Sequence, residues 1–142
     1  RSPAEAAAAW SAIGEQPAVA ERGIAFDAEF SVIVARGVHG DTAFFDPPEN
    51  RHEGGILRLS TVPAGAAVLR HVEAARRMAA GIAEALEHVG VLTVEFFACS
   101  DGPLVNEIAP RVHNSGHWTI EGAACSQFEQ HIRAVCGLPL GS

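Results

Sequence analysis

Apolar and polar residues alternate along several stretches of the chain, a pattern that predicts strands of a sheet with two different faces. The longest such stretch, FDAEFSVIVARG, adds β-branched and aromatic residues to the alternation and should place Glu29, Ser31 and Ile33 on one face. The expected strands are residues 26–37, 42–46, 55–62, 91–99 and 103–110. The last two are separated only by SDG and should form a hairpin, whereas the Pro- and Gly-rich residues 47–55 should form a loop.

Helical spacing occurs in three other stretches, which are residues 3–13, 66–88 and 126–137. The second carries an apolar side chain every three or four residues, from Val72 through Ala79 to Leu86. The third places three apolar side chains on one side, Phe128, Ile132 and Val135. Such faces could serve either the core or an interface. Strands outnumber helices and mostly follow one another, so the expected fold class is α+β with an antiparallel sheet and flanking helices.

Composition narrows the function. The chain has 142 residues, 48% of them hydrophobic, which predicts a single domain with a sizeable core. A net charge of −7 and a pI near 5.4 create a long-range field that repels phosphate backbones, and this argues against general nucleic-acid binding. All ten basic residues are arginine, and the chain contains no lysine. A bound nucleotide would therefore need local cations or a metal.

The cysteine content and the hydropathy indicate in which cellular compartment the protein is expected. Cys99, Cys125 and Cys136 are odd in number and lack CxxC spacing, which favours reduced, buried thiols over a disulfide framework. No apolar run approaches the roughly 18 residues that a membrane span needs, and no signal-peptide pattern is present. We therefore expect a soluble cytoplasmic protein without a membrane partner.

Two carboxylates should meet on the hairpin. If it turns about Asp101, Glu95 lies opposite Glu107 on the same face, where like charges destabilise a sheet unless something compensates. Magnesium would compensate, because it takes oxygen ligands and often binds through one or two carboxylates, and the Asn106 amide could join if the backbone allowed it. A shared proton in a general acid/base pair, a solvated acidic edge, or a register slipped by one residue are the alternatives.

A polar segment follows the hairpin. Arg111 offers a rigid fork that fits carboxylate or phosphate, and His113, Asn114, Ser115 and His117 follow in a glycine-containing loop where donors can approach a ligand. Beside paired acids, such a loop indicates a catalytic cleft. The two histidines also suit hydrogen-bonded surface positions. Their spacing resembles a zinc pair, but no third ligand stands at a convincing distance in the sequence.

The stretch from residue 94 to residue 140 resembles the ATP-grasp core of the 5-(carboxyamino)imidazole ribonucleotide synthetases, and NEIAPRVHNSGHWT is its most specific part. AERGIAFDAEFSVIVARG and GILRLSTVPA also resemble this family, whereas VEFF and NE alone would indicate only ATP-grasp enzymes in general. The resemblance implies a C-terminal ATP-grasp subdomain of a ligase in purine biosynthesis. Such a ligase uses ATP, Mg²⁺ and bicarbonate, through carboxyphosphate, to carboxylate aminoimidazole ribonucleotide.

The resemblance also implies roles for individual residues. Glu95 and Glu107 match the magnesium ligands, and Asn106 matches a neighbour that contacts the nucleotide. Glu29 matches the acid that holds the ribose hydroxyls, and His52 matches a further nucleotide contact. The segment that reads adenine through backbone groups matches Glu21, Arg22, Gly23 and Ile24.

The carboxylation side of the site matches the polar segment. Arg111 and His113 are the expected catalytic residues, and with Asn114 and Ser115 they match the place where bicarbonate and the aminoimidazole meet. Their chemistry fits, because phosphoryl transfer and a carboxylated intermediate both need positive charge and fixed donors where negative charge develops.

The departures from the family concern the phosphates. The family binds them with lysines and a glycine-rich loop, which this chain lacks. We therefore expect residues 1–142 to be one subdomain of a larger enzyme, without its N-terminal α/β domain, lysine-bearing half and C-terminal β-rich domain. Such a fragment should be inactive alone, and the intact enzyme should be a homodimer. The alternatives are another purine-pathway ATP-grasp ligase, or a non-catalytic module that binds a nucleotide or metal.

Overall fold

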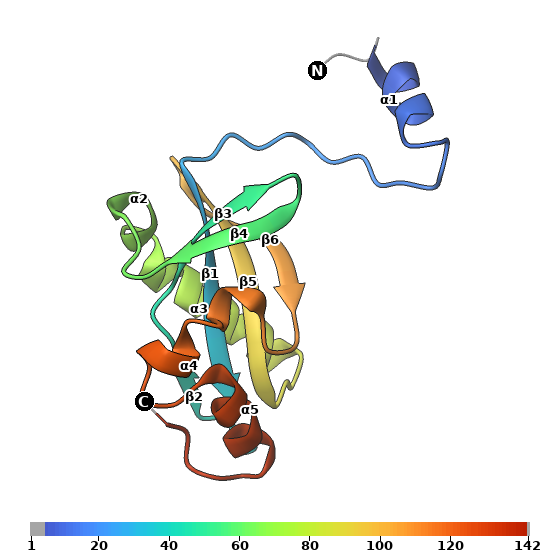
Figure 1. Cartoon of the computed structure of the whole chain (residues 1–142). Coiled ribbons are helices and arrows are strands. Elements are labelled where there is room, and N and C mark those ends of the chain that lie inside the picture. Colours follow the sequence, from blue (N-terminus) through green and yellow to red (C-terminus); the bar gives the residue numbers. More distant parts are fainter. Residues whose placement is uncertain (1–4, 142) are drawn as a thin grey trace.

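A computed structural model describes residues 5–141 of the chain. Its strands are β1 (Ala28–Arg36), β2 (Thr42–Phe44), β3 (Glu49–Glu53), β4 (Ile56–Thr61), β5 (Gly90–Cys99) and β6 (Gly102–Ala109). Its helices are α1 (Ala6–Ala12), α2 (Ala66–Leu69), α3 (Val72–Ala85), the 3₁₀ turn η2 (Asn114–Gly116), α4 (Thr119–Gly122) and α5 (Gln127–Val135). The strands form one antiparallel sheet in the order β4-β3-β1-β5-β6, with β2 also paired to β1, as Figure 1 shows. The expected α+β class is confirmed.

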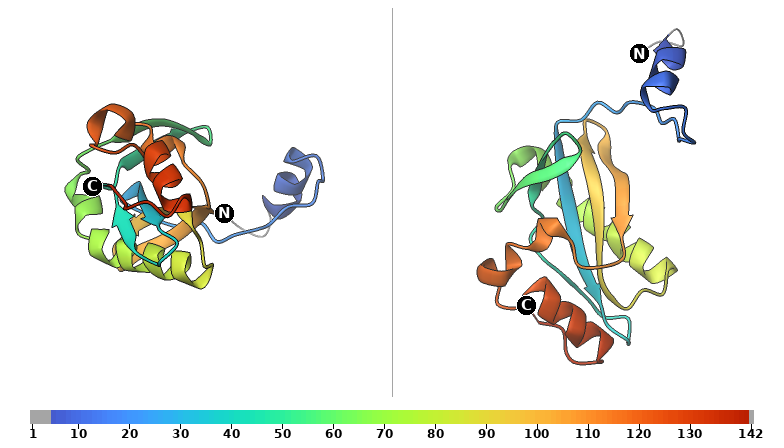
Figure 2. Two further views of the ribbon diagram at one scale, coloured as in Figure 1. Left: turned by 90° about the horizontal axis from the view of Figure 1, so that it is seen from below. Right: turned by 45° about the vertical axis from the view of Figure 1, so that its right-hand side comes forward.

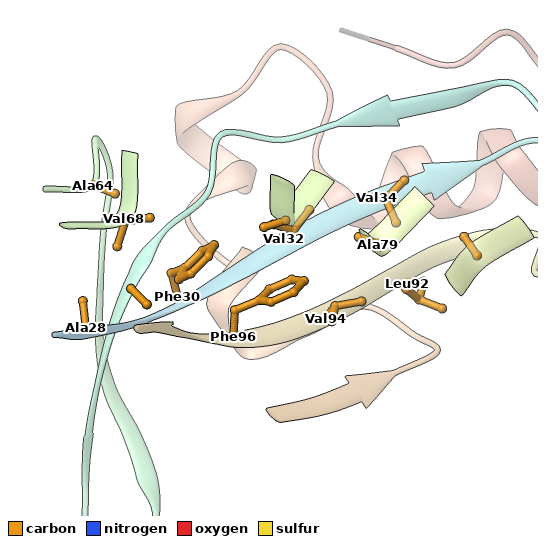
Figure 3. Packing of buried hydrophobic residues seen from close by; sticks show 13 residues of the cluster. Ala28, Phe30, Val32, Val34, Ala64, Val68, Ala79, Leu92, Val94 and Phe96 are labelled. Atoms are coloured by element: carbon orange, nitrogen blue, oxygen red, sulfur yellow. The ribbon is translucent and has the colours of Figure 1, made fainter. Parts of the chain in front are cut away.

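One face of the sheet packs on α3. Alternate residues of β1, such as Phe30 and Val32, join Val94 and Phe96 of β5 in a cluster that is almost fully buried (Figure 3). Ala79 packs against it from α3, where its small side chain lets the helix approach the strands. Each buried Val or Phe contributes about 1.5–3 kcal/mol relative to an exposed one, so this layer holds β1 and β5 in a fixed register.

The opposite face is covered at one end only. There Ile33 and Val91 lie beneath Val112, Trp118 and other residues of the chain after β6. Figure 2 shows this part of the chain, with α4 and α5, on the side of the sheet away from α3. Toward the other end, the same face carries the polar side chains described below.

Three boundaries differ from expectation. The expected loop 47–55 contains β3, because its polar residues pair with β1 and β4 at the edge of the sheet. The expected helix 66–88 is two helices, since the His71 amide bonds to the Val68 carbonyl three residues back and the chain restarts as α3. Within the expected helix 3–13, α1 covers Ala6–Ala12, and residues 3 and 4 lie outside the described residues.

One burial prediction was wrong: Cys136 is exposed, while Cys99 and Cys125 are buried as expected. Leu86 lies beyond the end of α3 and is exposed. On α5 the apolar side is the outer one: Phe128, Ile132 and Val135 are 40%, 57% and 44% exposed. The buried side of α5 carries two glutamines and an alanine, Gln127, Gln130 and Ala134.

None of the helices in the described part of the chain is long and apolar enough to cross a membrane.

Candidate active site

The β5–β6 hairpin brings two carboxylates together. Glu95 pairs directly with Glu107, as the sequence predicted. The register that produces this pairing differs from the expected one. Near the turn Cys99 pairs with Gly102, and a regular ladder continued from that pair would place Glu95 opposite Asn106. A bulge beside Glu95 takes up one extra residue on β6, and this restores the pairing of the two acids.

The same bulge determines where Asn106 points. Neighbouring residues of a regular strand face opposite sides, so Asn106 and Glu107 could not both reach Glu95 without it. Across the bulge the Asn106 side chain approaches Glu95, and its amide acts to lower the pKa of that carboxyl. Three oxygen-bearing side chains therefore converge on one spot of the sheet.

The charge on Glu95 is held in an unfavourable place. Its side chain is only 13% exposed, and burial is the main cause that raises its pKa above the ordinary value. His52 opposes that rise in pKa, whereas Glu107 and Glu29 add to it. A carboxylate that is both desolvated and close to other acids is suited to receiving a cation.

His113 faces Glu95 from the chain that follows β6. Its Nε2 lies 3.4 Å from Glu95 Oε1, and its Nδ1 lies 2.9 Å from Ser115 Oγ. The Ser115 backbone amide also donates to Nδ1, at 3.3 Å. Burial is the largest cause that lowers the pKa of His113, and Arg111 lowers it further while Glu107 opposes. Burial and the nearby guanidinium therefore disfavour the charged form of the imidazole.

A fully buried glutamine fixes the backbone of His113. The Gln127 side-chain amide accepts from His113 N at 3.0 Å and donates to His113 O at 2.7 Å. The Gln127 backbone N–H donates to Thr119 Oγ1, and that hydroxyl donates to the Gly116 carbonyl. A Cβ on Gly116 would lie 2.5 Å from Gln127 Oε1 and 2.8 Å from Ile33 Cδ1, so this close packing requires glycine.

The neighbouring strands add a polar row on the same face. Glu29 Oε2 lies 3.1 Å from His52 Nδ1, which joins the two residues that sequence analysis assigned to the nucleotide. A second set of hydrogen bonds links β4, β3 and β1: the Ser60 hydroxyl donates to the Asn50 side chain, and the Asn50 amide donates to the Ser31 hydroxyl. Ser31 lies opposite Glu95 in the ladder between β1 and β5. This chain of hydrogen bonds fixes β3 and β4 against the acidic pair.

The segment before β1 completes a pocket at the edge of this face. Residues 16–27 run in extended form to the sheet (Figure 1). A pocket of about 210 Å³ is lined by Glu21, Arg22, Ile24, Phe97, Leu104, Val105 and Asn106. A larger pocket next to it, of about 420 Å³, is lined in part by Arg22, Gly23 and Ile24. The expected adenine segment thus lies beside Asn106, close to the acidic pair.

The residues predicted for the carboxylation side differ in their exposure and in their hydrogen-bond partners. Ser115 is buried and bonded to His113, so its hydroxyl serves the imidazole and is not open to a ligand. Arg111 and Asn114 are exposed, and Arg111 Nη1 donates to the Val112 carbonyl. Among residues 5–141 no group of three or more His, Cys, Asp and Glu side chains is arranged to hold a metal.

Sequence reasoning missed Gln127 and the polar row of Ser31, Asn50 and Ser60. Gln127 stands in an ordinary amphipathic pattern, and its burial depends on the inverted packing of α5. No feature of the sequence indicated this burial.

Comparison with known proteins defines the class. The ATP-grasp domain matches residues 1–128, which is most of the chain. The chain belongs to the ATP-grasp family.

Its relatives are more specific. N5-carboxyaminoimidazole ribonucleotide synthase from Brucella melitensis is 55% identical over 139 residues, 97% of this chain and 38% of the relative. The synthase of that name from Pseudomonas aeruginosa is 46% identical over 142 residues, 100% of this chain and 39% of the relative. The chain therefore spans about two fifths of the length of these curated relatives.

Solved structures agree. The crystal structure of N5-carboxyaminoimidazole ribonucleotide synthetase from Thermus thermophilus matches with a TM-score of 0.91 at 52% identity, covering 100% of this chain and 39% of that one. The Aspergillus clavatus synthase in complex with ADP and 5-aminoimidazole ribonucleotide matches with a TM-score of 0.86 at 32% identity, covering 99% of this chain and 38% of that one. The expected resemblance is confirmed.

Proposed function

We propose that this chain is the C-terminal ATP-grasp subdomain of a ligase that carboxylates aminoimidazole ribonucleotide with bicarbonate and ATP in purine biosynthesis. The observation that carries the proposal is the convergence of Glu95, Glu107 and Asn106 at the bulge, with His113 facing Glu95. Relatives that match nearly the whole chain are named as synthases of N5-carboxyaminoimidazole ribonucleotide, which supplies the substrate class.

Magnesium fits the acidic pair. Glu95 and Glu107 supply the hard oxygen ligands that Mg²⁺ prefers, and the raised pKa of Glu95 marks a carboxylate whose charge is poorly compensated. The bound ion would offset the charge of the transferred phosphate. His113 would keep Glu95 oriented through its Nε2, and Asn106 would do so from the other side.

The nucleotide would lie between the extended segment and the hairpin. Backbone groups of Glu21, Arg22, Gly23 and Ile24 would read the adenine in the pockets that they line, one of them together with Asn106. Glu29 would hold the ribose hydroxyls, and its contact with His52 fixes the carboxylate for that purpose. The chain has no lysine, so we propose that cations for the phosphates come from polypeptide outside these residues.

The carboxylation side would use the loop after β6. Arg111 is exposed beside His113 and would bind bicarbonate or the carboxyphosphate made from it, with Asn114 adding an amide donor. Nearby fixed donors stabilise charge that develops during acyl transfer without reorganising at the moment of reaction.

We also propose a cytoplasmic homodimer for the intact enzyme. The exposed apolar side of α5, formed by Phe128, Ile132 and Val135, supports an interface there. Light scattering of the intact polypeptide at twice its sequence mass would agree with this assembly, and a monomer at micromolar concentration would contradict it.

The function is tested by measuring ADP released by the intact polypeptide that contains these residues, with Mg²⁺ and bicarbonate, in the presence and absence of aminoimidazole ribonucleotide. Release that needs both bicarbonate and the ribonucleotide is the expected result. An equal rate of ADP release with and without the ribonucleotide would indicate that the chain belongs to another ATP-grasp ligase. No release of ADP would favour a non-catalytic binding module. Glu84→Gln, an exposed acid on α3, is the matched control for substitutions of the acidic pair.

A further inference from the structure

The hydrogen bonds around His113 determine which ring nitrogen carries the proton. A backbone amide can only donate, so the bond from Ser115 N to Nδ1 requires that Nδ1 be unprotonated. In a neutral imidazole the hydrogen must then be on Nε2, which points at Glu95 Oε1. The Ser115 hydroxyl, 2.9 Å from Nδ1, completes the same arrangement by donating to it.

This arrangement depends on the backbone of the loop. Ser115 can reach Nδ1 only if the backbone at His113 keeps its orientation, and Gln127 holds both the N–H and the C=O of that residue. Gln127 is fully buried, and the hydrogen bonds of its side chain within the described residues go to His113. A buried amide satisfied in this way specifies a unique conformation.

We propose that Gln127 and Ser115 are positioning residues that hold His113 as its Nε2–H tautomer toward Glu95, so that His113 acts in the reaction as a hydrogen-bond donor and not as a base. The proposal rests on the proposed function for its chemistry, but its structural part can be tested separately.

The assignment has a chemical consequence. When the amine of the ribonucleotide attacks carboxyphosphate, a C–N bond forms and the C–O bond to phosphate breaks, with the electron pair going to the phosphate oxygen. His113 cannot take the amine proton, because Nδ1 already accepts from Ser115 and Nε2 carries hydrogen. The departing phosphate takes that proton and leaves as hydrogen phosphate, which balances the step without a protein base.

Solid-state NMR of the intact polypeptide, labelled with ¹⁵N in histidine, tests the tautomer. The signals of His113 are assigned by their loss in His113→Gln. We expect a pyridine-type Nδ1 and a pyrrole-type Nε2 in the wild-type protein, and a mixture of tautomers in Gln127→Glu. A pyrrole-type Nδ1 in the wild-type protein, or an unchanged His113 spectrum in Gln127→Glu, would overturn the proposal.

The fold offers a matched control one turn along the same helix. Gln130 is also buried, and its amide accepts from Gly141 N and donates to Gly141 O, each at 2.8 Å, without contacting His113. Gln130→Glu should therefore destabilise the protein to a similar extent as Gln127→Glu but leave the His113 spectrum as it is. A shifted spectrum in both variants would overturn the positioning role, because general loosening of α5 would then be responsible.

Kinetics test the donor role. The amide of His113→Gln can still donate near the position of Nε2 but cannot accept a proton at neutral pH, whereas His113→Leu can do neither. A hydrogen bond to a charged group corresponds to about 10–150-fold in rate, so the Leu variant should lose that much kcat and the Gln variant clearly less. Equal loss in the two variants would overturn the donor role. Absence of any ligase activity would refute the proposed function, while the NMR result would still decide the tautomer.

Discussion

Glu95→Gln should make the protein more stable in the absence of magnesium and less responsive to it. Glu95 is 13% exposed, and burial and the neighbouring Glu107 both act to raise its pKa. The charge therefore costs free energy in the folded state that the unfolded chain does not incur. A glutamine keeps the shape of the side chain and still accepts a hydrogen bond from His113 Nε2, so the substitution removes mainly the charge.

The size of the effect follows from the pairing of the strands. Side chains directly opposed on a sheet have Cβ atoms about 5 Å apart. At that distance two unit charges repel by about 3 kcal/mol at an effective dielectric constant of about 20, and by about 1 kcal/mol in water. Since Glu107 is exposed, the lower value is the better guide, and we expect Glu95→Gln to raise the free energy of unfolding by about 1 kcal/mol, or Tm by about 2–4 °C.

The contribution of Glu95 to stability should also depend on pH in a defined direction. Its folded pKa is raised above the ordinary value of 4.5, so its neutral form stabilises the fold below that pH, and this contribution is lost as pH rises through the folded pKa. The variant and the wild-type protein should therefore be close in stability near that ordinary value, and the advantage of the variant should grow above it. Urea unfolding of the intact polypeptide at several pH values measures this difference.

Magnesium with nucleotide should reverse the order. A ligand at about 100 times its Kd stabilises the folded protein by about 2.7 kcal/mol, and the variant should lose most of this gain together with one ligand carboxylate. The reasoning would be refuted if Glu95→Gln were less stable than the wild-type protein at neutral pH without magnesium, or if both gained equally from it. Glu84→Gln should show neither effect.

Three further outcomes are expected for the intact polypeptide. Glu107→Gln should lower kcat far more than it lowers stability, and unchanged turnover at saturating magnesium would count against its role as a ligand. Gly116→Ala should cost about 1–3 kcal/mol in urea unfolding, because its Cβ would meet Gln127 and Ile33 at 2.5 and 2.8 Å; a loss below about 0.5 kcal/mol, on the scale of ordinary surface changes, would contradict the packing. Asn106→Leu should weaken nucleotide binding, measured by calorimetry, with little change in Tm; unaltered affinity would remove Asn106 from the site.

Much of the sheet could be predicted from the sequence, because alternation along β1 and β5 reflects directly which side of each strand is buried. β3 was missed because its sequence, ENRHE, is polar on both sides and is held by pairing with β1 and β4 and by the Asn50 hydrogen bonds. Tertiary contacts of this kind leave no periodic signal.

The site divides in the same way. The facing of Glu95 and Glu107 followed from hairpin geometry, although the bulge that secures it could not be read from spacing. Ser115 lies in the 3₁₀ turn after β6, and its orientation toward His113 depends on the three-dimensional path of the chain, which spacing does not reveal. Gln127 could not be found, because the apolar side of α5 suited the core and an interface equally well, and only the packing of the helix in the fold shows that its other side is buried.

The bulge at Asn106 has a consequence for how such a site can arise. If Asn106 were deleted, Val105 and Glu107 would follow each other in a regular ladder, still opposite Phe96 and Glu95. The residues near the turn and those at the far end of the hairpin would keep their pairing partners, so Asn106 can be inserted or removed without changing the rest of the ladder. One additional codon is enough to turn a face with two carboxylates into one with a third, neutral oxygen donor, without any change to the strands that carry it.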